Sequence, residues 1–301
     1  MKVATALLGI ASTVLACGGG DPLAGGDGPG GSAAGGDEGT TATAGSGGDG
    51  STSSSGAGAD SAGGEGGMPS DVIGLDCGNA ADTLLCDDFE SGAIDDSLWS
   101  VVTQNGAEVT VDDTVVLDGD YALHVTLPSS NATEGALRAK DFLFPLPDNS
   151  MYGRVFIHVG PAVPDTHSKA ITLRGPLDGQ NAQYRLDCNG GDFNSRYYTP
   201  AIDQNIQHGG LRKFGYEAPT ETWLCVEWHY DGTNHEMRYW FDGEAVDDMT
   251  VLETEDPQWT APSFDVFDIG WRTYQAGKTA DEYHIHYDAL VIDDERIGCG
   301  Q

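Results

Sequence analysis

Basic and polar side chains alternate with apolar ones on three segments that follow one another in the chain. If these segments are neighbouring strands, their polar side chains gather on one face of a sheet. Guanidinium groups there would neutralise the carboxylate of a uronic acid, and an imidazole would take the proton from the adjacent C5 carbon. The pattern therefore makes β-elimination from an acidic polysaccharide one candidate reaction. The candidate catalytic residues are Arg154, His158, Arg174, Gln183 and Arg185, accompanied by Thr172.

Two residues are candidates for the base of such a reaction. His158 shares the polar face with Arg154, whereas alternation places Tyr184 on the apolar face and disfavours it. Retaining hydrolases instead need two carboxyl groups about 5–5.5 Å apart. The pattern Glu-x-Asp-x-x-Glu, which supplies such a pair on one strand, is absent from the chain. Hydrolysis by paired carboxyl groups is therefore not expected.

Residues 222–246 predict a β-hairpin whose turn is Asp-Gly-Thr-Asn at 231–234. Pairing Tyr230 with His235 gives one apolar and one polar face. On the polar face Glu227 then lies opposite Arg238, and Trp240 offers a flat aromatic surface. Such a surface is typical of glycan binding. The apolar face consists of Leu224, Val226, Trp228, Met237, Tyr239 and Phe241.

Short apolar or alternating segments run through the remainder of the chain, bounded by Asp-Gly, Gly-Gly, Pro and Asn-Gly. No helical period is convincing beyond a turn near 95–99, and strands do not alternate with helices. This organisation predicts an all-β fold, an antiparallel β-sandwich. The predicted strands are 107–111, 121–127, 151–159, 168–174, 183–187, 264–271 and 283–292.

Further motifs resemble those of a known superfamily. They are CDDFESG and SLW within 86–99, VLDGDYALHV at 116–125, and the hairpin together with YDALVI at 287–292 and RIGC at 296–299. These resemble the concanavalin A-like lectin/glucanase jelly rolls, nearest the polysaccharide lyase-like group that includes glucuronan lyases. The resemblance covers nearly all of 84–299 and implies a jelly roll. The lyase signatures Arg-x-Glu-Leu, Gln-Ile-His and Tyr-x-Lys-x-Gly are missing, so the resemblance implies fold more than chemistry.

A calcium ion in this superfamily often ties the first strand, an early glycine turn and the last long strand together. Carried over by position, the resemblance implies a structural Ca²⁺ held by Glu90, Asp118, Asp120 and Asp288. Carboxylate and carbonyl oxygens are the ligands that Ca²⁺ prefers.

Six cysteines are present, namely Cys17, Cys77, Cys86, Cys188, Cys225 and Cys299. We expect Cys188–Cys225 and Cys77–Cys86 disulfides, which leave Cys299 unpaired. The alternative is Cys77–Cys299 with Cys86 free. One conflict is visible, because alternation places Cys188 on the core side and Cys225 on the outer side.

The N-terminal part predicts export. Residues 1–17 resemble a signal peptide that ends in a bacterial lipobox, Val-Leu-Ala-Cys, with Cys17 as the lipidated residue. Residues 18–70, rich in Gly and Ser, predict a disordered tether, and 71–301 the jelly-roll domain. We expect a lipid-anchored monomer at the outer membrane or cell surface.

The net charge of −34 argues against nucleic acid and anionic membrane surfaces as partners. A polysaccharide or other glycan is the expected partner. We expect a lectin-like, carbohydrate-binding protein that uses Glu227, Arg238 and Trp240. The alternatives are a polysaccharide lyase acting on a uronate-containing glycan and a structural cell-surface protein.

Overall fold

The computed structural model describes Cys77, residues 83–201 and residues 211–300. The expected signal peptide at 1–17, with lipidation at Cys17, and the expected tether at 18–70 lie outside these residues. Within the described part of the chain, no helix is long and apolar enough to cross a membrane.

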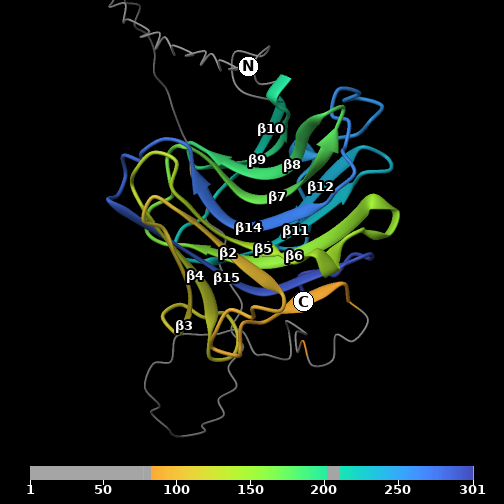
Figure 1. Ribbon diagram of the computed structural model, residues 1–301. Coiled ribbons are helices and arrows are strands. Elements are labelled where there is room, and N and C mark those ends of the chain that lie inside the picture. Colours follow the sequence, from red (N-terminus) through yellow and green to blue (C-terminus); the bar gives the residue numbers. More distant parts are fainter. Residues whose placement is uncertain (1–76, 78–82, 202–210, 301) are drawn as a thin grey trace, which may run out of the picture. The chain divides into compact units, whose positions relative to one another are not determined.

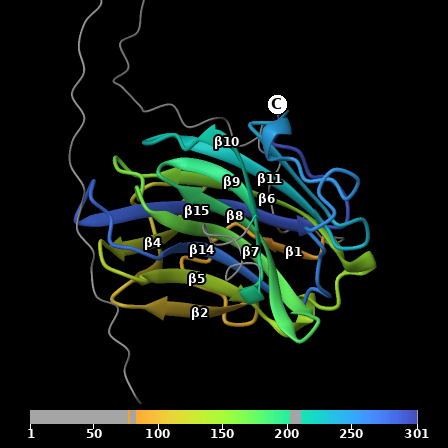
Figure 2. The same ribbon diagram turned by 90° about the horizontal axis from the view of Figure 1, so that it is seen from above.

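The described residues form two antiparallel sheets stacked as a sandwich (Figures 1 and 2). This confirms the all-β, jelly-roll prediction. The eight-stranded sheet has the order β13 (Glu244–Ala245), β12 (Glu236–Phe241), β11 (Trp223–Asp231), β6 (Ser150–Val159), β15 (Glu282–Asp293), β4 (Ala122–Pro128) and β3 (Glu108–Asp112), with β1 (Leu85–Asp87) also paired to β15. The seven-stranded sheet has the order β10 (Leu211–Glu217), β9 (Asp192–Tyr198), β8 (Gln180–Asn189), β7 (His167–Leu177), β14 (Val266–Thr273), β5 (Glu134–Ala139) and β2 (Trp99–Gln104).

Apolar side chains from the two inner faces fill the space between the sheets. Trp228 of β11 stacks on Phe267 of β14, with ring centroids 6.2 Å apart. Tyr184 of β8 packs edge-on against Tyr230 of β11, and its hydroxyl donates to the Trp259 carbonyl oxygen at 2.5 Å. Because Tyr184 is fully buried in this core, burial holds its pKa far above the usual range. Tyr184 is therefore excluded as a base.

The hairpin register differs from the prediction by two residues. Tyr230 pairs with Met237, so Glu227 lies opposite Trp240 and not opposite Arg238. The strand continues through Asp231, whose carboxylate accepts the N–H groups of the turn, and His235 takes up the positive φ of 57°. A shift of two residues keeps every side chain on its predicted face. All six predicted core residues of the hairpin are accordingly buried.

One of the two expected disulfides is present and the other is wrong. Cys77 is bonded to Cys86, as predicted, whereas Cys225 is bonded to Cys299. Cys188 is a buried free thiol. Strand β8 continues regularly through Cys188 and turns it into the core, while Cys225 lies on the outer face of the other sheet. The Cys77–Cys299 alternative is wrong too, because Cys77 is bonded to Cys86 and Cys299 to Cys225 of β11.

Candidate functional site

The outer face of the seven-stranded sheet carries a cleft of about 920 Å³. The strands of this sheet bend, so that its outer face is concave (Figure 1). Strands β7, β8, β9, β10 and β14 contribute the floor and walls. The lining side chains include His167, Gln183, Arg185, Asn189, Arg196, Tyr198, Arg212, Arg272, Tyr274 and Lys278.

Cations gather in this cleft although the chain is strongly acidic. Five of the 14 Lys and Arg residues line it, on a chain of net charge −34. Cations concentrated in a concave site raise the local concentration of an anionic ligand, even against the overall field. The five residues are Arg185, Arg196, Arg212, Arg272 and Lys278.

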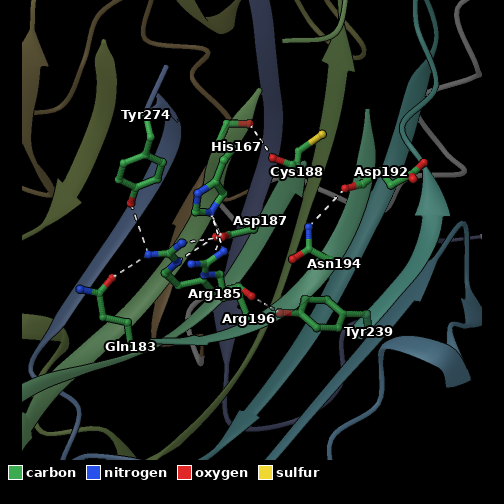
Figure 3. A network of polar contacts seen from close by, with 11 residues as sticks. His167, Gln183, Arg185, Asp187, Cys188, Asp192, Asn194, Arg196, Tyr239 and Tyr274 are labelled. Carbon is green, nitrogen blue, oxygen red and sulfur yellow. Dashed lines mark hydrogen bonds and ion pairs between the residues drawn. The ribbon is translucent and has the colours of Figure 1, made fainter. Parts of the chain in front are cut away.

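Asp187 anchors the floor of the cleft (Figure 3). Its buried carboxylate accepts Arg185 Nε at 2.8 Å and forms an ion pair with Arg185 Nη2. Arg196 Nε lies 3.4 Å from the same carboxylate. Burial alone would raise the pKa of Asp187, but the Arg185 charge and the contact with His167 hold that pKa well below its usual range. Asp187 is therefore ionised and fixes both guanidinium groups from below.

His167 lies beside this anchor. Its Nε2 is 2.9 Å from Asp187 Oδ2 and 2.7 Å from Arg196 Nη1, as drawn in Figure 3. Burial lowers the pKa of His167, and the charges of Arg196 and Arg185 act in the same direction against Asp187. The imidazole is therefore neutral at neutral pH, which is the form that a general base requires.

Aromatic hydroxyl groups complete the cleft. Arg185 Nη1 lies 3.3 Å from the Tyr274 hydroxyl and 3.4 Å from Gln183 Oε1. The Arg272 guanidinium lies 4.9 Å from the centroid of the Tyr274 ring. A phenol hydroxyl beside one guanidinium group, with a second one over its ring, can donate a proton and is stabilised if it becomes anionic. Imidazole, phenol, amide and guanidinium groups thus share one concave surface.

An extra residue in β7 explains why His167 faces the cleft. Alternation from Ile171 would turn His167 toward the core, but the β7–β8 register shifts between Lys169 and Ile171. Ala170 is the additional residue and packs into the core together with Ile171. Such a bulge reverses the facing of all residues before it. The sequence alone therefore did not single out His167.

The structure separates the five predicted catalytic residues. Gln183 and Arg185 lie in the cleft. Arg174 lies on the same sheet but pairs with Asp268 at 3.5 Å, outside the cleft lining. Arg154 and His158 lie on β6, in the other sheet. The expected convergence of all five is wrong, because the chain crosses from one sheet to the other between β6 and β7.

The C-terminal segment covers the outer face around Arg154. Arg154 is buried, its Nη1 donates to the Gly298 carbonyl oxygen at 2.9 Å, and burial lowers its pKa to about 10. Arg296 forms an ion pair with Glu227 at 2.7 Å, and its guanidinium lies 4.3 Å from the centroid of the Trp240 ring. The aromatic platform expected for glycan binding is therefore engaged by Arg296.

Arg238 does not take part in that contact. It pairs with Glu236 at 2.7 Å on its own strand. The predicted Glu227–Arg238 pair is wrong, because the hairpin register places Glu227 beside Trp240 and the Cys225–Cys299 bond brings Arg296 to it.

The residues expected to bind calcium surround the loop at 117–121. Glu90 accepts the N–H groups of Asp120 at 2.8 Å and Tyr121 at 3.1 Å. Asp288 accepts those of Leu117 at 3.0 Å and Asp118 at 3.4 Å. Burial and the nearby Glu90 charge raise the pKa of Asp288 to about 7. The expected ligands thus share this loop, and each of the two carboxylates accepts backbone N–H groups from it.

The amino-acid sequence was compared with models of known protein families. The polysaccharide lyase-like family model described as "Cip1-like, core domain" matches residues 88–295. The search of the curated proteins found no match to the chain.

Solved structures with the same fold include two with TM-scores above 0.5. Cellulose induced protein Cip1 has a TM-score of 0.55 and 20% identity, over 72% of this chain and 100% of that one. Endo-β-1,4-glucuronan lyase from the fungus Trichoderma reesei has a TM-score of 0.52 and 13% identity, over 71% of this chain and 96% of that one. At these identities the likeness concerns the fold.

Proposed function

The chain belongs to the Cip1-like polysaccharide lyase-like family, and on that premise we propose that it is a lyase that cleaves a uronate-containing glycan by β-elimination. One observation carries the proposal. The concave cleft gathers five cations with a neutral imidazole and a phenol hydroxyl on a chain of net charge −34. The cleft thus offers the kinds of group that this reaction needs.

The proposed roles follow from the position of each group. Arg185 and Arg196, held by Asp187, neutralise the uronate carboxylate and so acidify the C5 proton. Neutral His167 takes that proton. The Tyr274 hydroxyl gives its proton to O4 as the C4–O4 bond breaks, and the electron pair of the C5–H bond forms the C4=C5 double bond. No water is consumed.

Binding without cleavage in the same cleft is the second candidate. One contact favours it, because His167 Nε2 is already engaged by Asp187 and Arg196. A base must have a free lone pair within reach of the substrate proton. This candidate keeps the expected glycan partner and moves it from the Trp240 surface to the cleft.

The test offers the purified protein polyglucuronate, other polyuronates and a neutral β-glucan. A lyase leaves an unsaturated sugar at each cut, which absorbs in the ultraviolet. We expect absorbance to rise with one or more polyuronates and not with the neutral glucan. Retention on a polyuronate column without new absorbance would support binding alone. Neither retention nor new absorbance with any polyuronate would refute both candidates.

We also propose a structural Ca²⁺ between Glu90, the 118–120 turn and Asp288, supported by the two carboxylates that contact this one loop. The lipobox motif supports a further proposal, that the protein is exported and anchored through Cys17 at the outer membrane or cell surface. Radiolabelled palmitate should enter the wild-type protein and not the Cys17→Ser variant. Equal labelling of the two would contradict the anchor.

A further inference from the structure

A second group of polar side chains lies on the outer face of the eight-stranded sheet, remote from the cleft. His124 of β4 pairs directly with His286 of β15, and His286 pairs with His158 of β6, so the three form a row across adjacent strands. His284 lies two residues before His286 on the same face. The ring centroids of His124 and His286 are 4.0 Å apart, and those of His124 and His284 are 5.2 Å apart.

In two of these rings, one nitrogen contacts a carboxylate. Asp112 Oδ2 lies 2.6 Å from His124 Nδ1, and Glu282 Oε1 lies 3.2 Å from His284 Nε2. A carboxylate can only accept, so each contact places the proton of a neutral ring on the nitrogen next to the carboxylate. The opposite nitrogens, His124 Nε2 and His284 Nδ1, then carry lone pairs.

These two nitrogens face each other at 3.0 Å. Two lone pairs at that separation repel, so the pair must share either a proton or a metal ion. A carboxylate that orients an imidazole, whose other nitrogen binds a metal, is a recurring arrangement in metalloproteins. The Thr126 hydroxyl, 3.3 Å from His124 Nε2, adds a further polar group.

His286 lies beside this pair. Asp112, His124 and His286 each offer a polar atom, and these atoms lie within 4.8 Å of one another. The His286 ring stacks on that of His124 at an interplanar angle of 20°, so the in-plane lone pairs of these two rings do not converge on one ion. Its Nε2 lies 3.3 Å from the Thr114 hydroxyl. His286 therefore packs against His124 and fixes the plane of its ring.

We propose that His124 and His284 bind one divalent transition-metal ion, with Asp112 and Glu282 orienting the two rings. Imidazole ligands with carboxylates behind them suit Zn²⁺, Ni²⁺ or Cu²⁺ and do not suit Ca²⁺, which takes oxygen ligands. This site is distinct from the calcium site proposed at Glu90 and Asp288. It joins β4 to β15 and does not depend on the proposed lyase activity.

The test uses the full chain without a polyhistidine tag, stripped with a chelator and titrated with Co²⁺ and then Zn²⁺. We expect one saturable Co²⁺ per chain with visible d–d absorption, displaced by Zn²⁺ and not by Ca²⁺. His284→Ala, at a half-exposed position, should weaken binding more than about tenfold, and Glu282→Gln should weaken it up to about tenfold. His229→Gln, on β11 of the same sheet, is the matched control and should bind as the wild type.

Two results would overturn the site. One is the absence of saturable Co²⁺ and Zn²⁺ binding by the wild type. The other is equal binding by His284→Ala and His229→Gln, which would place any metal elsewhere. Circular dichroism of each variant checks that the fold is intact. His124→Gln should also weaken metal binding, and if this variant unfolds, binding by His284→Ala decides whether the site exists.

Discussion

At the scale of single residues, Asp187 positions the side chains on the floor of the cleft. One buried carboxylate holds Arg185 and Arg196 and touches His167 before any ligand arrives. Groups fixed in this way lose little freedom when an anion binds, which favours both affinity and rate. The stability of the fold also depends on this one charge, because its removal leaves the buried Arg185 and Arg196 without their carboxylate partner.

We therefore expect Asp187→Asn to lower the free energy of unfolding by about 3–5 kcal/mol. Glu236→Gln is the control, since the side chain of its partner Arg238 is 41% exposed and a pair near the surface is worth about 0–1 kcal/mol. Urea denaturation of the two variants measures the difference. Equal losses would show that Asp187 does not anchor the arginines.

His167 gives a prediction about pH. Burial lowers its pKa from the ordinary 6.5, so the base stays neutral into mildly acidic solution. The acid limb of kcat/KM should therefore lie below 6.5. The Arg196 charge contributes to the lowering, so Arg196→Gln should move the limb to higher pH. An acid limb that does not move would remove His167 from the role of base.

The sequence predicts part of this site. Regular alternation along β8 places Gln183 and Arg185 correctly. His167 could not be found in the same way, because the additional residue Ala170 reverses the alternation. Arg196 was missed because β9, DFNSRYY, turns Ser195 inward and carries tyrosines on both faces, which hides its period.

At the scale of elements, the loop at 117–121 joins the first and last strands of the domain through backbone N–H groups. Glu90 and Asp288 receive these hydrogen bonds from opposite ends of the loop. Gly119 has a φ of +72°, and a side chain there would overlap the Glu90 carboxylate. The loop is therefore fitted to its two carboxylates.

The calcium proposal predicts how stability depends on pH. The pKa of Asp288 is raised from 3.8 to about 7, so over that window the native state holds a proton that the unfolded chain has lost. Without metal, the free energy of unfolding should then fall as pH rises through the window. Ca²⁺ binds the ionised carboxylate and should raise the melting temperature most above pH 7.

Thermal melts with calcium and with chelator across this window measure the effect. Asp288→Asn should remove both the dependence on pH and the response to calcium. A wild-type melting temperature that is the same with calcium and with chelator would contradict the site.

Strand positions were more predictable than strand pairing. The seven predicted strands correspond to β3, β4, β6, β7, β8, β14 and β15, because their apolar alternation is strong. The hairpin register was missed by two residues, since alternation fixes the face of a strand and leaves even shifts open. The placing of β6 and β7 in different sheets could not be read from alternation at all.

At the scale of the whole molecule, an acidic chain presents a cationic hollow on one sheet and a partly covered outer face on the other. The C-terminal segment, bonded through Cys299, engages Trp240 and Glu227 with Arg296. The net charge of −34 repels an acidic polymer, whereas the five cations that line the cleft attract it. The account therefore assigns the glycan to the concave face.

One measurement tests this assignment most directly, namely the rate of ultraviolet absorbance with polyglucuronate for a matched pair of variants. Tyr274→Phe removes a hydroxyl in the cleft, and Trp240→Ala removes the platform on the outer face. We predict that Tyr274→Phe is slower than the wild type by more than about 100-fold, the scale of a general-acid contribution, and that Trp240→Ala is unchanged. A Tyr274→Phe variant as fast as the wild type, or loss of activity in Trp240→Ala, would contradict the account.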